Sequence, residues 1–135
     1  MSFSDERIAI EKRLNDRWST TPIAFENVPF TAPEDGLYVA LDIMAGEGLQ
    51  QDINSNPRHR YVGIIQVRVN VPAHQGSATA RTYADTIAGF FRSQTFSHGN
   101  SGDIVCRTPS IDVLGITDGQ YTLAIRIPYY RDAIF

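Results

Sequence analysis

The stretch from Tyr61 to Phe91 constrains the fold of this chain more than any other part of the sequence. From Ile65 to Val71, apolar and polar residues alternate, which predicts a β-strand with one buried face. Pro72 ends this strand. Apolar residues then recur at helical spacing, at Ala80, Tyr83, Ala84, Ile87 and Phe91. A strand followed by an amphipathic helix predicts that helix and sheet share one core.

The rest of the chain supplies one more helix and several strands. A helix is predicted from residues 2–4 to Trp18, and Ile10, Leu14 and Trp18 lie on one face of it. The order of elements predicts a single α+β domain over residues 1–135, an antiparallel-rich mixed sheet of about five to six strands with two helices packed on it. The further strands are expected at residues 23–25, 37–44 and 103–108 and on both sides of a turn at 118–119.

The Asp118-Gly119 dipeptide predicts a two-residue hairpin turn, because these residues accept positive φ angles readily. The pairs that follow from such a turn are Ile116 with Tyr121 and Leu114 with Leu123. The next pair on the same face joins Asp112 to Ile125, a polar residue to an apolar one. A bulge or fraying of the ladder is therefore expected at that pair.

Two segments lack a clear secondary-structure pattern. Residues 45–60 form a polar connection that is long for a small domain, and such loops are usually functional or disordered. Alternatively, they form a hairpin whose strands extend beyond the body of the sheet. Leu49 and Ile53 stand out as apolar residues in this polar segment. Residues 129–135 follow Pro128 and are interpreted as a C-terminal tail.

Composition excludes several classes of protein. The net charge of −3 provides no global basic field for nucleic acid or an anionic membrane, although 11 of the 12 basic residues are arginine. Cys106 is the only cysteine, so no internal disulfide can form, and a reducing compartment is expected. The start of the chain lacks the apolar run of a secretory signal, and no run is long enough to span a membrane. The chain is expected to be soluble.

The sequence shows no constellation of catalytic, cofactor-binding or metal-binding residues. Gly46 and Gly48 lack the third glycine of a dinucleotide-binding loop. Ser97, His98 and Asp103 crowd one glycine-rich loop and do not resemble a catalytic triad on a scaffold. The three histidines are not at metal-ligand spacing. We therefore predict that the protein is not an enzyme and needs no cofactor.

A series of turn and helix residues carries a family resemblance over nearly the whole chain. These residues are Gly63, Pro72, Gly76, Ala84-Asp85, Phe90-Phe91, Pro109, Asp118-Gly119 and Pro128-Tyr129. In this order they resemble the phage tail terminator-like family, of the lambda type. The resemblance implies a structural protein of a virion tail or prophage, assembled in the cytoplasm of a bacterial host. Its implied partners are further copies of itself in a ring, commonly a hexamer, the tail-tube protein and the head completion protein, with no nucleic acid or membrane.

A cyclic ring requires two different patches on each subunit that complement each other. Residues 45–60 and 129–135 are the candidate patches, because both carry apolar residues that one chain does not obviously bury. The candidate interface residues are Leu49, Gln50, Gln51, Ile53, Arg58, Arg60, Tyr130, Ile134 and Phe135. The alternative is that both segments are flexible parts of a protein that is monomeric in solution.

Two other functions remain open. One is a different phage head–tail joining or completion protein on a similar fold. The other is a small-molecule-binding or enzymatic domain with a cleft between helix and sheet. A deep pocket that gathers Asp42, Arg68 or a histidine would favour the second alternative, and a filled core would count against it.

Overall fold

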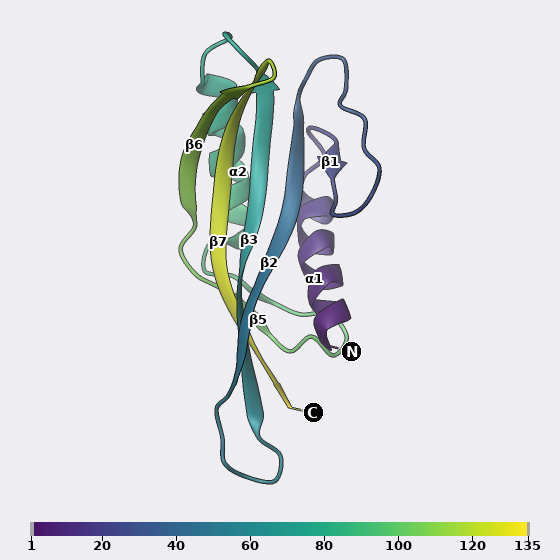
Figure 1. Cartoon of the computed structure of the whole chain (residues 1–135), viewed down its shortest axis with the longest axis vertical. Helices are drawn as coiled ribbons and strands as arrows, with labels where there is room; N and C mark the ends of the chain where they lie inside the picture. The colour runs from purple at the N-terminus through teal and green to yellow at the C-terminus, as the bar shows by residue number, and fades with distance from the viewer. Residues whose placement is uncertain (1, 135) are drawn as a thin grey trace.

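The computed structural model describes residues 2–134, in which two helices lie on one face of a seven-stranded sheet (Figure 1). The predicted α+β class is confirmed. The additional strand is β4, whose two residues are too few to produce a periodic pattern. The elements in chain order are α1 (Ser2–Arg17), β1 (Ile23–Ala24), β2 (Tyr38–Gln50), β3 (Arg58–Pro72), α2 (Ala78–Phe91), β4 (Thr95–Phe96), β5 (Ile104–Cys106), β6 (Ser110–Thr117) and β7 (Gln120–Ile134).

Three long strands, β2, β3 and β7, form the centre of the sheet. The strand order is β1-β2-β3-β7-β5-β4, and β6 also pairs with β7. One edge of β7 pairs with β3 from Gln120 to Ile134. Its other edge is shared, because β6 occupies the first half and β5 the second. All these pairings are antiparallel except that between β1 and β2.

The core lies between the helices and one face of the sheet, which we call the inner face. The predicted alternation is confirmed, since Ile65, Val67 and Val69 are all fully buried there. Trp18 closes one end of the core, with its ring centre 5.1 Å from that of Tyr83 in an edge-to-face contact. The helix residues buried against the sheet are Ile10, Leu14, Ala80, Ala84, Ile87, Ala88 and Phe91.

The predicted loop at residues 45–60 is mostly strand. β2 continues to Gln50 and β3 begins at Arg58, so that only residues 51–57 form the loop. The ladder shifts register between Ala45 and Gly48, where two residues of β2 face one residue of β3. This bulge interrupts the period of two, which is why the strand is not visible in the sequence pattern. The alternative interpretation, a hairpin that extends beyond the sheet, is the one observed.

The predicted C-terminal tail is also wrong, because residues 129–134 belong to β7. They pair with β3 up to the contact of Ile134 with Arg58. The alternation was hidden because a charged residue, Arg131, occupies a buried position on the inner face and is only 2% exposed.

The β6–β7 hairpin has the predicted turn, and Ile116 pairs with Tyr121. The expected pairing of Leu114 with Leu123 is wrong, because the bulge falls at Leu114, two residues closer to the turn than predicted. Beyond the bulge Val113 faces Leu123 and Ile111 faces Ile125. The shifted register thus restores the pairing of apolar residues that the sequence-based register would have lost.

A buried ion pair joins the first helix to the last strand. Nε of Arg131 and the hydroxyl of Tyr129 each donate a hydrogen bond of 2.9 Å to Oε1 of Glu6. Nη1 of Arg131 also donates to the carbonyl of Ser101 at 3.4 Å. Burial and the Glu6 carboxylate raise the pKa of the Tyr129 hydroxyl, so it remains a donor.

We expect Glu6→Ala to destabilise the protein by about 3–5 kcal/mol, because it leaves the charge of Arg131 buried without its counterion. The measurement is the free energy of unfolding in urea. Asp16→Ala is the matched control, since it removes an exposed partner of Lys12 at 3.2 Å and should change stability by less than about 0.5 kcal/mol. Equal losses in the two variants would contradict a structural role for the buried pair.

Candidate functional site, an uncovered face of the sheet

The β2–β3 hairpin and the end of β7 project beyond both helices (Figure 1). We call this three-stranded region the extension and define it as residues 44–64 and 128–134. The pairing of β2 with β3 and of β3 with β7 continues from the body of the sheet into the extension, apart from the bulge in β2. The extension is therefore a structured projection of the sheet rather than a loop.

The inner face of the extension is held by aromatic and charged side chains. The guanidinium carbon of Arg131 lies 4.5 Å from the centre of the Tyr61 ring. Glycines make room for the rings, because a Cβ atom on Gly63 would lie 2.6 Å from the hydroxyl oxygen of Tyr129. A Cβ atom on Gly48 would collide with the Tyr61 ring. These glycines serve close packing between neighbouring strands.

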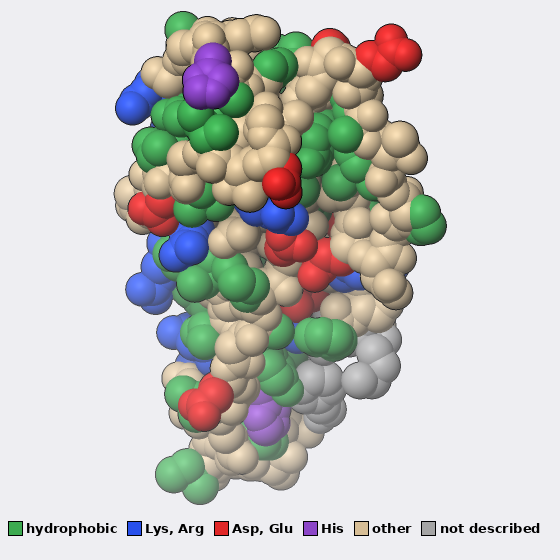
Figure 2. Space-filling view, turned by 45° about the horizontal axis from the view of Figure 1, so that its top comes forward, with side chains coloured by type: hydrophobic (Ala, Val, Ile, Leu, Met, Phe, Trp, Pro, Cys, Tyr) green, Lys and Arg blue, Asp and Glu red, His purple; other side chains and the backbone are tan. Residues whose placement is uncertain are grey.

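The opposite face, which we call the outer face, carries no helix. Its part on the extension presents apolar side chains to solvent, although strands exposed on one face normally place polar residues there. The exposed fractions are 57% for Leu49, 43% for Val62, 42% for Met44 and 36% for Ile64. With Pro128 and Tyr130, these four residues form what we call the outer patch. Figure 2 shows hydrophobic side chains between charged ones on the lower half of the molecule, where the extension lies.

Charged pairs border the outer patch. Arg60 donates two hydrogen bonds to Asp132, of 2.8 Å and 3.0 Å, and its guanidinium carbon lies 4.3 Å from the centre of the Tyr130 ring. This hydrogen bonding lowers the pKa of the Asp132 carboxyl and raises the pKa of Arg60. Arg58 lies within 4 Å of both Asp52 and Asp132, with N–O distances of 3.7 Å and 3.9 Å.

Most of the candidate interface residues lie together on the extension. Pairing of β3 with β7 brings the hairpin residues next to Tyr130, so the two predicted patches form one surface and not two. Ile53, at the hairpin tip, is fully exposed. Ile134 ends β7, and Phe135 lies outside the described residues. The residues on the hairpin are Leu49, Gln50, Gln51, Ile53, Arg58 and Arg60.

Sequence reasoning missed four members of the outer patch, which are Met44, Val62, Ile64 and Pro128. A signal was available for two of them. Val62 and Ile64 fall on the face of the predicted strand that also carries Gln66 and Arg68. Apolar residues on the polar face of an amphipathic strand indicate a second contact surface.

A second group of exposed apolar residues lies on β6. Ile111, Val113, Leu114 and Ile116 are 40%, 53%, 50% and 51% exposed, and we call them the β6 strip. Among the described residues, β6 pairs only with β7, so its other edge has no strand partner. Exposed apolar edge strands are usually covered or blunted by charge, and β6 carries only one charged residue, Asp112.

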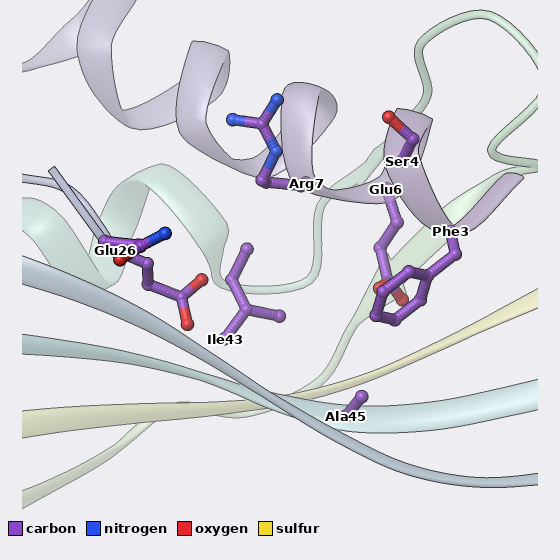
Figure 3. A pocket seen from close by; sticks show the side chains of 8 residues that line it. Phe3, Ser4, Glu6, Arg7, Glu26, Ile43 and Ala45 are labelled. Carbon is purple, nitrogen blue, oxygen red and sulfur yellow. The ribbon is translucent and has the colours of Figure 1, made fainter. Parts of the chain in front are cut away.

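The structure does not favour a small-molecule site at the residues that the sequence suggested. Asp42 and Arg68 form an ion pair of 3.2 Å on the outer face. An open hollow of about 570 Å³ does lie between α1 and β2, but neither of these residues nor a histidine lines it (Figure 3). Of its three charged residues, Glu6 is bound to Tyr129 and Arg131, whereas Arg7 binds Glu11 and points away from the sheet. The third, Glu26, lies on the other side of Ile43 from Glu6. The polar groups therefore do not converge on one ligand position.

Two further features of residues 2–134 bear on function. No group of three or more histidine, cysteine, aspartate or glutamate side chains in this part of the chain is placed to hold a metal ion. Neither α1 nor α2 has the length and apolar character needed to cross a bilayer.

Comparison with known proteins identifies the family. The family model described as "Phage tail terminator protein" matches residues 7–129. The chain belongs to the phage tail terminator protein family. It is accordingly a structural protein of a phage tail, and the family is not an enzyme class. The resemblance seen in the sequence is thus confirmed.

Two solved structures share the fold of this chain. The first is 28% identical to this chain, and the alignment covers 100% of this chain and 97% of that chain with a TM-score of 0.78. Another is a chain from "Virion of native gene transfer agent (GTA) particle", which is 14% identical, with 99% and 98% coverage and a TM-score of 0.59. At this identity the second likeness shows the fold alone. No curated protein sequence matches the chain.

We expect Arg60→Ala to raise the pKa of Asp132 towards its ordinary value, because the variant removes the hydrogen bonds that favour the carboxylate. The measurement is an NMR titration of the side-chain carboxyl carbon. Since the pKa is lowered in the folded protein, the pair stabilises the extension at neutral pH, and this stabilisation is lost as the pH falls through the carboxyl range. Arg126→Ala, which removes a partner of Asp112 instead, should leave the titration of Asp132 unchanged.

Proposed function

We propose that this tail terminator family protein caps the end of the phage tail tube and contributes to the head–tail junction. The observation that carries the proposal is the outer patch, an apolar surface on a structured projection that no helix covers. Monomeric proteins seldom leave such a surface on a projecting element without a partner. The expected partners are the tail-tube protein and the head completion protein. The protein would be assembled with them in the host cytoplasm and would form part of the virion tail.

A capping ring also needs contacts between copies of the chain. Because the two segments expected to form complementary patches lie side by side, the extension provides only one half of a heterologous contact. The β6 strip is a second exposed apolar surface, on the part of the sheet next to the first half of β7. We propose that it provides the other half in a ring of about six subunits, as in the family the chain resembles. Chains would remain monomeric until they meet the tube or reach high concentration.

The direct test is binding to tail tubes assembled from the tube protein encoded in the same phage genome. Electron microscopy of negatively stained tubes would count ends that carry a cap. The proposal predicts that the protein binds tube ends and stops further growth of the tube. A protein that leaves the ends bare but binds the head connector would instead be a different head–tail joining protein.

The variant Leu49→Asp should weaken tube-end binding by about tenfold or more, because it places a charge on the apolar outer patch. Val28→Asp is a closely matched control, since Val28 is 56% exposed, compared with 57% for Leu49, and lies outside the extension. Unfolding in urea should show similar stability for both variants, because both sites are exposed. Equal capping by the two variants would exclude the outer patch as the tube-binding surface.

The variant Val113→Asp should reduce self-association by about tenfold, because it introduces a charge into the β6 strip. Sedimentation equilibrium over a range of concentrations measures the effect, with Val28→Asp again as the control. If Val113→Asp assembles as the natural sequence does, the ring contact lies elsewhere on the molecule.

A further inference from the structure

We propose that the outer patch binds a segment of the tail-tube protein in which a carboxylate stands beside an apolar side chain. The carboxylate would bind Arg107, and the apolar side chain would fill the hollow next to it. The inference rests on the proposed function for the identity of the partner. The chemistry of the segment comes from the outer face itself.

A shallow hollow on the outer face provides the apolar part of this site. Its volume is about 510 Å³, and it spans β2, β3, β7 and the connection from β5 to β6. From the outer patch it includes Met44, Val62 and Ile64, which are exposed, and Pro128 and Tyr130, which are half-buried. The residues that line it are Met44, Ala45, Gly46, Val62, Gly63, Ile64, Arg107, Pro128, Tyr129 and Tyr130. A hollow of this size and composition fits one or two side chains of a partner.

Arg107 is the charged residue that lines this hollow, and the connection between β5 and β6 fixes its position. Its backbone N–H donates a hydrogen bond of 2.8 Å to the carbonyl of Pro128. Its guanidinium carbon lies 5.3 Å from the centre of the Tyr130 ring. An arginine supported in this way by an aromatic ring loses little side-chain freedom when it binds a carboxylate.

The charge balance of the outer face indicates what Arg107 would bind. The other arginines on this face have acidic partners, since Arg58 pairs with Asp52, Arg60 with Asp132, Arg68 with Asp42 and Arg126 with Asp112. Within residues 2–134, Arg107 forms no ion pair. One unbalanced positive charge therefore remains, at the edge of an exposed apolar surface. A partner with a carboxylate at this point would complement both the charge and the fork geometry of the guanidinium.

Small probes test the chemistry without any tail component. We expect 4-phenylbutyrate, which joins an apolar group to a carboxylate, to bind with a dissociation constant of the order of millimolar and to shift NMR signals of Val62, Ile64 and Tyr130. The neutral 4-phenylbutanamide should bind at least about fivefold more weakly, and Arg107→Ala should remove this difference. Equal binding of the two probes, or shifts confined to other surfaces, would overturn the proposal.

Binding of Arg107 variants to tube ends tests whether the tail-tube protein is the partner. Arg107→Glu should weaken tube-end binding about a hundredfold at low salt, because it replaces attraction by repulsion. Arg107→Lys should retain binding within about tenfold, since it keeps the charge but loses the fork. Arg92→Glu is the control, because Arg92 is exposed at the end of α2, on the helix side of the sheet.

The outcomes separate this inference from the proposed function. If the natural sequence caps tube ends and Arg107→Glu binds them within about twofold of it, the carboxylate contact is overturned. The terminator role would remain intact in that case. If the protein with its natural sequence caps no tube end, the terminator role is excluded, and the tube protein is excluded as the partner. The probe experiment would still decide whether the surface prefers an apolar carboxylate.

Discussion

The ion pair between Glu6 and Arg131 is the interaction on which the extension depends. It joins the start of α1 to the end of strand β7 across 125 residues, in a place where both charges are almost completely buried. Tyr129 binds the same carboxylate, and the Tyr61 ring lies against the guanidinium. Because Glu6 lies near the start of α1, this cluster anchors the base of the extension to the helix, and the hairpin beyond it has no helix on either face.

This arrangement gives the sheet two different ends. In the body, the helices bury an apolar inner face, and the outer face carries cross-strand ion pairs such as Asp42 with Arg68. On the extension, charged and aromatic groups hold the inner face, whereas the outer face exposes Met44, Val62 and Ile64. The apolar surface thus changes sides along the same three strands. A monomer gains nothing from an exposed apolar surface, but a protein that assembles on a tail tube needs one.

The sequence predicted the parts of the fold that follow simple periods. Both helices and the buried face of β3 were correct, because their apolar residues recur at regular spacing. The sequence left residues 45–60 open between a loop and a hairpin and predicted a tail at residues 129–135, because a bulge between Ala45 and Gly48 and a buried charge at Arg131 break the alternation on which strand prediction depends. The same reason explains the register of β6, where the bulge lies at Leu114. Arg107 could not be recognised from sequence, since its place beside Tyr130 depends on the way the chain crosses from β5 to β6.

The proposal that the outer face of the extension is the assembly surface can be tested most directly by a cryo-electron microscopy reconstruction of tail tubes capped with this protein. The extension is expected to lie against the tube with its outer face buried, while α1 and α2 face away from the tube axis. The residues of the outer patch should then be in contact with tube protein or with a neighbouring copy of the chain. A cap in which the helices contact the tube and the outer patch faces solvent would contradict the proposed mode of assembly.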